Sequence, residues 1–143
     1  MSAVQFELPG RRVVDLFAGS GALGLESLSR GAAHATFVET WPRAIAQLKA
    51  NIEMLGAADQ ADIVREDALE FAGRVEPGEF DLAFADPPYG QGLAAALLER
   101  FAERPFASTL WVEHRSDERL PRLPGARTRR YGDTSITSIP ARP

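Results

Sequence analysis

The 143-residue sequence has no cysteine and, among its 16 basic residues, only one lysine. Without cysteine the chain has no disulfide bonds, no thiolate metal site and no cysteine nucleophile. No apolar stretch approaches the roughly 20 residues that a membrane-spanning helix needs, and residues 1–8 carry no basic cluster of the kind that begins a signal peptide. We therefore expect a cytoplasmic protein with no membrane partner, no metal site and a single globular core.

The sequence also lacks an overall positive charge, since its formal net charge is −4. Proteins that bind nucleic acids usually carry a basic surface, so this balance argues against RNA binding. The distribution of charge argues the other way, because six arginines lie close together: Arg115, Arg119, Arg122, Arg127, Arg129 and Arg130. This group fits a solvated surface and a phosphate-contacting edge equally well.

Apolar runs and helical spacings alternate along the chain. Strands are expected at 12–17, 35–39, 61–65, 80–85 and 108–113, with helices at 22–30, 42–55, 68–75 and 93–102. Two further strands, 128–131 and 135–139, are expected around a turn at Gly132 and Asp133. This pattern predicts an α/β fold whose mostly parallel sheet ends in an antiparallel hairpin. In such sheets, ligands bind at the carboxyl ends of the strands.

A glycine-rich turn follows the first expected strand. Gly19, Gly21 and Gly24 have the G-x-G-x-x-G spacing, which allows a tight turn and close approach of the backbone to a ligand. The spacing alone fits either a dinucleotide site or a simple strand-to-helix turn. Asp15, at the end of the strand, disfavours a diphosphate and favours a ligand with an ammonium group. S-adenosylmethionine carries such a group on its methionine end.

Two further acids follow the next two strands. Glu39 is placed to accept hydrogen bonds from both hydroxyls of a ribose, a role that nucleotide cofactors of several kinds share. Asp67 could accept a hydrogen bond from an adenine amino group, with the amide of Ala68 near a ring nitrogen, or could instead cap the helix that begins there. Trp41 is more typical of a packing residue than of an adenine-stacking one. The expected cofactor-binding residues are Asp15, Phe17, Ala18, Gly19, Ser20, Gly21, Glu39, Thr40, Asp67 and Ala68.

The sequence Asp86-Pro87-Pro88-Tyr89 ends the fourth expected strand, and we interpret these four residues as catalytic. Two prolines cannot continue a central strand, so they make a rigid loop at the sheet edge. The Asp86 carboxylate and the Pro87 carbonyl could accept both N–H groups of an exocyclic amine and aim its lone pair at a methyl donor. Tyr89 could stack on a base held out of its helix. The alternative is a structural Pro-Pro turn.

Taken together, these segments resemble the RsmD family of small-subunit (16S) rRNA guanine-N2 methyltransferases. The resemblance rests on residues 15–26, Ser-Arg-Gly-Ala at 29–32, Phe-Val-Glu at 37–39 and Asp-Pro-Pro-Tyr-Gly at 86–90. It extends from about Leu8 to Thr134. The glycine turn and the Asp-Pro-Pro-Tyr motif also occur in DNA adenine-N6 methylases, whereas their combination with the segment at 29–32 is more specific.

The resemblance implies one methyltransferase domain over residues 1–143, with a doubly wound, Rossmann-like sheet of seven strands and S-adenosylmethionine as cofactor. It implies 16S rRNA or a small-subunit assembly particle as partner, and we expect a monomer. Family members carry a segment before the first strand that includes an arginine-containing helix. Since only ten residues precede Arg11, we expect this chain to lack that segment.

Three other interpretations remain open from the sequence. An adenine-N6 methylase of DNA or RNA would use the same Asp86 chemistry on another base. A cofactor-binding domain without catalytic activity would keep the glycine turn alone. A nicotinamide-dependent oxidoreductase is the weakest alternative, because no plausible hydride-transfer residues accompany the turn.

Overall fold

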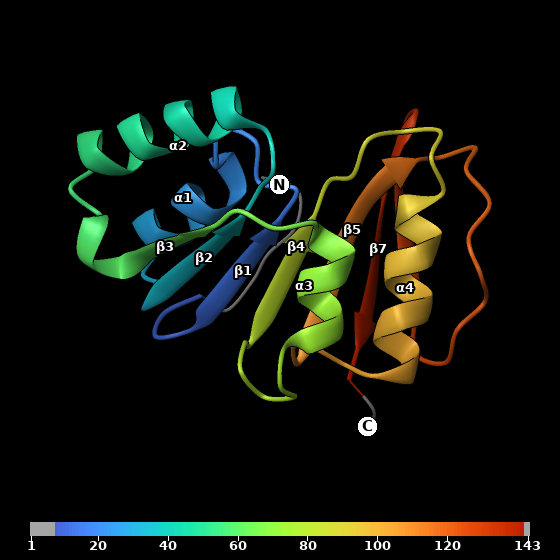
Figure 1. The fold of residues 1–143 in the computed structure, drawn as a ribbon. Helices are drawn as coiled ribbons and strands as arrows, with labels where there is room; N and C mark the ends of the chain where they lie inside the picture. The colour runs from blue at the N-terminus through green and yellow to red at the C-terminus, as the bar shows by residue number, and fades with distance from the viewer. Residues whose placement is uncertain (1–7, 142–143) are drawn as a thin grey trace.

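The computed structural model describes residues 8–141, which contain a seven-stranded sheet in the order β3-β2-β1-β4-β5-β7-β6 (Figure 1). Strands β1 to β5 run parallel, and β7 lies between β5 and β6, antiparallel to both. The strands are β1 (Arg12–Leu16), β2 (His34–Val38), β3 (Ala61–Val64), β4 (Leu82–Ala85), β5 (Thr109–Arg115), β6 (Arg127–Tyr131) and β7 (Thr134–Pro140). The expected mostly parallel sheet with an antiparallel end is confirmed.

Helices cover both faces of the sheet, as the doubly wound arrangement requires (Figure 1). They are α1 (Ala22–Ser29), α2 (Pro42–Met54), α3 (Ala68–Arg74) and α4 (Leu93–Glu103), with a 3₁₀ helix η1 (Ala58–Gln60) before β3. Helices α1 and α2 pack on one face, and α3 and α4 on the other. Within residues 8–141, no helix combines the length and apolarity needed to cross a membrane.

The hydrophobic core has two layers because consecutive strand residues point to opposite faces. In β1, Val13 packs with Phe37 and Leu48 under α1 and α2, whereas its neighbour Val14 packs with Leu97 under α3 and α4. The sheet is thus buried on both sides near its centre, as the apolar sequences of β1 and β4 predict.

Two local features differ from the sequence prediction. Strand β4 begins at Leu82 and not at Phe80, although the Phe80 carbonyl still accepts a hydrogen bond of 3.2 Å from the N–H of Ser108; the Phe80 ring packs against Phe71, with ring centroids 6.1 Å apart. The 3₁₀ helix η1 was not predicted, and the insertion of β7 between β5 and β6 was left open. The position of β7 depends on its pairing with the distant strand β5, which periodicity does not report. The helix η1 is a single local turn, closed by a hydrogen bond of 2.9 Å from the Gln60 N–H to the Ala57 carbonyl, and is too short to show a periodicity.

Two glycines lie inside helices, and their surroundings differ. A Cβ atom added to Gly24 in α1 would lie 2.3 Å from the Phe37 ring, which is itself fully buried in β2. A Cβ added to Gly73 in α3 would meet only the end of the flexible Arg100 side chain, at 2.6 Å. Gly24 therefore sets how closely α1 approaches the sheet, whereas Gly73 does not constrain packing.

We predict that alanine at these two positions has opposite effects on stability. Gly73→Ala should raise the free energy of unfolding by up to about 1 kcal/mol, since alanine is the better helix former. Gly24→Ala should lower it by about 1–3 kcal/mol, because overpacking against Phe37 outweighs the same gain. Urea denaturation of the two variants measures both values. Equal stabilisation by both substitutions would contradict the packing role of Gly24.

Candidate cofactor and catalytic site

Three acidic residues converge at the carboxyl ends of neighbouring strands. Leu16, the last residue of β1, pairs with Val38 of β2 and Ala85 of β4. Glu39 and Asp86 directly follow those two partners, and Asp15 directly precedes Leu16. Glu39 and Asp86, far apart in the sequence, thus lie on either side of β1, each about one strand spacing from it.

Asp15 is almost fully buried, with 2% of its surface exposed. Its Oδ2 accepts a hydrogen bond of 3.0 Å from the backbone N–H of Gly24, at the start of α1. Burial raises the pKa of the Asp15 carboxyl to about 8; the Gly24 hydrogen bond opposes this rise, and the charges of Asp86 and Glu39 add to it. Asp15 is therefore largely protonated at neutral pH, and a cation bound nearby would favour its ionised form.

Glu39 joins the first two strand ends through backbone hydrogen bonds. Its Oε1 accepts from the N–H of Gly19 at 2.8 Å, and its Oε2 accepts from the N–H groups of Thr40 and Trp41, each at 2.9 Å. These bonds fix the carboxylate before any ligand arrives. Oε1 keeps a second lone pair that can accept a hydrogen bond from a ribose hydroxyl. The ribose role of Glu39 stays a prediction, and Oε1 is the atom that would make the contact.

The glycine-rich turn has a left-handed backbone at several positions. Phe17 has a φ of 58°, which is rare for a side chain of its size and costs on the order of 1–3 kcal/mol. Gly19, also at 58°, has nothing within 4 Å of an added Cβ, so a ligand could approach its backbone closely. Gly21 differs, because its Cβ would lie 2.3 Å from Leu48. Gly19 thus leaves the backbone accessible to a ligand, whereas Gly21 allows close packing against Leu48.

The other expected cofactor residues lie beside this turn or after β3. Ser20 and Thr40 are exposed, and Ala18 and Ala68 are buried. Asp67 caps α3, since its Oδ2 accepts a hydrogen bond from the N–H of Glu70 at 3.1 Å. The capping role is therefore present, and an adenine contact would use the other carboxylate oxygen. Trp41 is 60% exposed, so in the described structure it is not a core residue.

The Asp-Pro-Pro-Tyr segment forms the rim of the site beyond β4. Pro87 is buried, whereas Pro88 and Tyr89 are exposed. Partial loss of hydration raises the pKa of the Asp86 carboxyl to about 6, and the charge of Glu113 on the next strand adds to the rise. The Arg115 guanidinium, at the end of β5, lies 5.8 Å from the centre of the Tyr89 ring.

Glu113 and Arg115 are two residues that the sequence interpretation did not assign to this site. Both lie near the carboxyl end of β5, the strand that pairs with β4. The signal that could have identified them was the rule applied to the other strands, that polar residues at a carboxyl end face the ligand. Arg115 was instead grouped with the arginines that follow it.

The family model described as "Conserved hypothetical protein 95" matches residues 1–139. This chain belongs to that family. Its resemblance to the RsmD family is confirmed by its similarity to the ribosomal RNA small subunit methyltransferase D of Haemophilus influenzae, at 34% identity over 112 residues. That alignment covers 75% of this chain and 58% of the relative. The Bacillus subtilis protein YlbH, a relative named as an rRNA methyltransferase, is 37% identical over 137 residues, covering 89% of this chain and 74% of its own length.

Solved structures of this family and of more distant proteins share the fold. A methylase from Haemophilus influenzae superimposes with a TM-score of 0.82 at 28% identity, covering 94% of this chain and 89% of its own. An RNA methyltransferase from Salinibacter ruber, solved with S-adenosyl-L-homocysteine, gives a TM-score of 0.71 at 14% identity, covering 94% and 84%. The chain spans little more than half the length of the Haemophilus enzyme that shares the RsmD name. The Rossmann-like methyltransferase fold is nevertheless shown over nearly all of this chain.

We predict that Asp15 makes the protein less stable as pH rises. Its pKa is 3.8 as a free group and about 8 when folded, so between these values the folded state holds a proton that the unfolded state has lost. Raising the pH across this window lowers the free energy of unfolding by on the order of 1 kcal/mol per pH unit. Asp15→Asn keeps an oxygen acceptor for Gly24 and removes this dependence.

Urea denaturation at pH 5 and pH 7.5 tests the prediction. The stability of Asp15→Asn relative to the unmodified protein should improve by on the order of 3 kcal/mol between the two values. Other titrating groups contribute equally to both proteins and cancel. If the free energy of unfolding changes equally with pH in Asp15→Asn and in the unmodified protein, Asp15 is ionised in the folded state and the prediction is wrong.

Proposed function

We propose that this chain transfers a methyl group from S-adenosylmethionine to the exocyclic N2 amine of a guanine in small-subunit (16S) rRNA, as a cytoplasmic monomer. The observation that carries the proposal is that Glu39 and Asp86 directly follow the ends of the two strands on either side of β1, beside the buried Asp15, with Tyr89 exposed on the loop after Asp86. The names of its family relatives support the rRNA substrate.

The site fits the cationic cofactor that the proposal requires. Bound S-adenosylmethionine supplies a methyl group on a positively charged sulfonium, together with an ammonium group. Glu39 and Asp86 provide negative charge around one strand end, and Asp15 adds to it when a nearby cation favours its ionised form. Burial is the main cause of the raised pKa values of Asp15 and Asp86, and repulsion from nearby carboxylates adds to both rises. A cation relieves this repulsion, whereas a diphosphate increases it. The ligand of the Salinibacter ruber neighbour is the demethylated product of the same cofactor.

Asp86 and Pro87 orient the target amine in this proposal. The lone pair of an exocyclic amine is delocalised into the base, so the amine is a weak nucleophile. The Asp86 carboxylate accepts one N–H and the Pro87 carbonyl accepts the other, which draws the nitrogen toward tetrahedral geometry. The new N–C bond forms as the C–S bond breaks, and the nitrogen then releases one proton to solvent through Asp86. With its pKa of about 6, Asp86 is mostly ionised at neutral pH and acts as an acceptor.

The rim holds the base in place. Tyr89 is 46% exposed, and its ring is available to stack on a guanine turned out of its RNA helix. Pro88 restricts the backbone immediately before Tyr89. Because Asp86 and Pro87 would accept N–H groups from adenine N6 in the same way, base analysis of the product is part of the test.

We predict that the protein binds S-adenosylhomocysteine and that Glu39→Ala weakens this binding by about 1–3 kcal/mol, the range for losing hydrogen bonds to a charged group. Isothermal titration calorimetry measures both constants. Asp59→Ala, in η1, is the control for removal of an exposed acid elsewhere. Tighter binding of NAD than of S-adenosylhomocysteine would refute the methyltransferase proposal, and an unchanged constant for Glu39→Ala would refute its ribose role.

We predict that Asp86→Asn slows methyl transfer within the bound complex by about 10²–10³-fold, because it removes amine orientation and charge complementarity in the transition state. The affinity for S-adenosylhomocysteine should change less than about twofold, since Asp86 faces the amine. Single-turnover transfer from labelled cofactor to unmodified small-subunit particles, free rRNA and DNA measures the rate, with base analysis of the product.

The pH dependence gives a second test of Asp86. The rate for the unmodified protein should rise with pH as Asp86 ionises near pH 6 and then level off, and this step should be absent in Asp86→Asn. Near-normal turnover of Asp86→Asn would reduce the segment to a structural turn. Methylated adenine in the product would replace guanine N2 by adenine N6 as the target. Failure of all three substrates would leave a cofactor-binding domain without activity.

A further inference from the structure

Sheet register places part of the arginine group on one face. Paired residues on neighbouring strands point to the same side of a sheet. Arg115 pairs with Thr134, and Thr134 pairs with Tyr131, so these three side chains share a face. Since alternate residues of a strand also share a face, Arg129 and Arg127 follow Tyr131 on it. Arg130 points to the other face.

This face is accessible over β5, β7 and β6 in the described residues. In β7, Ser135, Thr137 and Ile139 are buried on the side covered by α4, whereas Thr134, Ile136 and Ser138 on the other side are half-exposed. Figure 1 shows α1 and α2 lying over the β1–β3 side of the sheet, away from β7, and β6 lies beyond β7 at the edge. All five residues of β6 are exposed.

Two tyrosine rings and three arginines lie along this face. Tyr89 is 46% exposed and adjoins the Arg115 guanidinium. Tyr131, which is 39% exposed, lies two strands beyond Arg115, a separation of about 10 Å. Arg129 and Arg127 continue down β6 in steps of about 7 Å. We call Tyr89, Arg115, Tyr131, Arg129 and Arg127 the tyrosine–arginine track.

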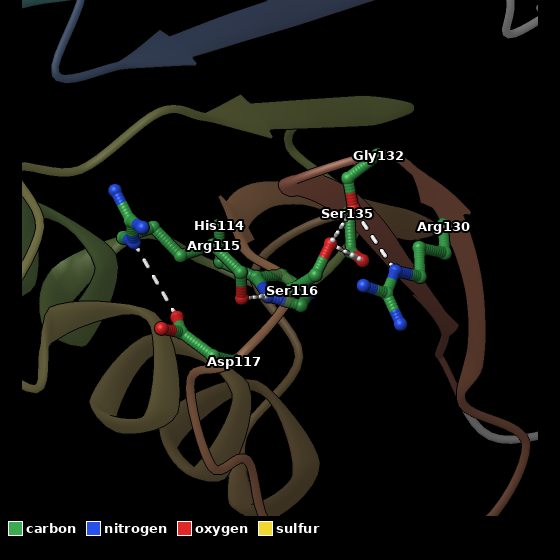
Figure 2. A network of polar contacts seen from close by, with 7 residues as sticks. All are labelled: His114, Arg115, Ser116, Asp117, Arg130, Gly132 and Ser135. Carbon is green, nitrogen blue, oxygen red and sulfur yellow. Dashed lines mark hydrogen bonds and ion pairs between the residues drawn. The ribbon is translucent and has the colours of Figure 1, made fainter.

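Polar contacts hold Arg115 and the turn after Tyr131 in place (Figure 2). Asp117 pairs with Arg115 at 3.3 Å. The Ser116 hydroxyl donates to the Gly132 carbonyl oxygen at 2.8 Å and lies 2.8 Å from the Ser135 hydroxyl, which must then donate to it. Arg130 donates to the same carbonyl at 2.9 Å. The β6–β7 turn is therefore fastened to the end of β5, which fixes Tyr131 relative to Arg115.

The track differs in charge from the site beside it. Asp15, Glu39 and Asp86 lie at the ends of β1, β2 and β4, and Glu113 is an acid on the track's own face. Arg127 and Arg129 lie beyond these acids, on the far edge strand. A bound cation is thus favoured at the strand ends, and an anionic polymer is favoured on β6.

We propose that the tyrosine–arginine track binds the single-stranded RNA that flanks the target base, with a base stacked on Tyr131 and backbone phosphates on Arg129 and Arg127. Proteins bind single-stranded nucleic acids without sequence preference when the bases stack on aromatic side chains and a positively charged surface beside them contacts the backbone. The track continues directly from Tyr89. The inference rests on the proposed function only for the identity of the RNA.

The alternative role for these arginines is protection of the edge strand. Exposed charges on an edge strand prevent pairing with other chains. Glutamate serves this purpose as well as arginine does, whereas it repels phosphate. A charge reversal therefore separates the two roles.

The test measures binding of a fluorescent single-stranded RNA of about ten nucleotides to the protein saturated with S-adenosylhomocysteine. Arg129→Glu should raise the dissociation constant roughly tenfold and reduce the slope of log K against log salt by about 0.7. Lys49→Glu is the matched charge reversal, because Lys49 lies on α2 next to Asp62 and Ile63 of β3, at the opposite edge of the sheet. It should leave binding within about twofold of the unmodified protein.

A second pair of variants tests the stacking contact. Tyr131→Ala should weaken RNA binding about tenfold, and Tyr131→Phe should preserve it. Affinity for S-adenosylhomocysteine and the melting temperature, measured on the same proteins, should stay constant. A loss that Tyr131→Phe shares with Tyr131→Ala would show that the hydroxyl, and not the stacking ring, is what matters, which overturns the stacking contact.

Three outcomes would overturn the track: no RNA binding by the unmodified protein, equal binding by Arg129→Glu and Lys49→Glu, or binding to anionic phosphatidylserine vesicles in preference to RNA. Methyl transfer assayed in parallel keeps the two proposals apart. Transfer with equal RNA binding by both charge reversals refutes the track alone. Arginine-dependent RNA binding without transfer to any substrate supports the track and refutes the proposed activity.

Discussion

The buried carboxyl group of Asp15 is the constraint around which the site is arranged. A carboxylate with 2% exposure is costly to ionise, and the fold offers it one backbone N–H, from Gly24. That single bond does not offset the desolvation, so the pKa rises to about 8. A cationic ligand would supply the missing compensation. Without a ligand, the buried Asp15 carboxyl lowers the free energy of unfolding, and binding of a cationic ligand removes this cost. Folding, protonation and ligand binding are therefore coupled through this one carboxyl group.

The same hydrogen bond explains why helix packing matters to the site. Gly24 can donate to Asp15 only if α1 approaches β1 and β2 closely, and its missing side chain leaves room for the Phe37 ring. Gly21 allows the same approach against Leu48. Gly19 has no neighbour within 4 Å of an added Cβ, so its backbone stays open to the approach of a ligand. The three glycines of one motif thus have different physical roles, and two of them act through packing.

Much of the fold could be predicted because its signals are local. The apolar runs of β1 and β4 and the helical spacing of α4 identified their elements, with boundaries off by one or two residues. The order of β5, β7 and β6 could not be predicted in this way, because it depends on the pairing of β7 with β5, which lies about twenty residues earlier in the chain. The strand-end positions of Asp15, Glu39 and Asp86 were predictable for the same reason as the strands. The contact between Tyr89 and Arg115 was not, since it requires the β4–β5 register.

The charge of the chain shows most clearly why composition misleads here. A net charge of −4 argues against RNA binding only if the charges are mixed. The sheet instead separates them: acids collect where β1, β2 and β4 end, and arginines lie along β6. A cofactor with excess positive charge and a substrate with a negative backbone require such a division within one surface. The bulk value adds these two regions of opposite sign to the rest of the surface, so it predicts the affinity of neither.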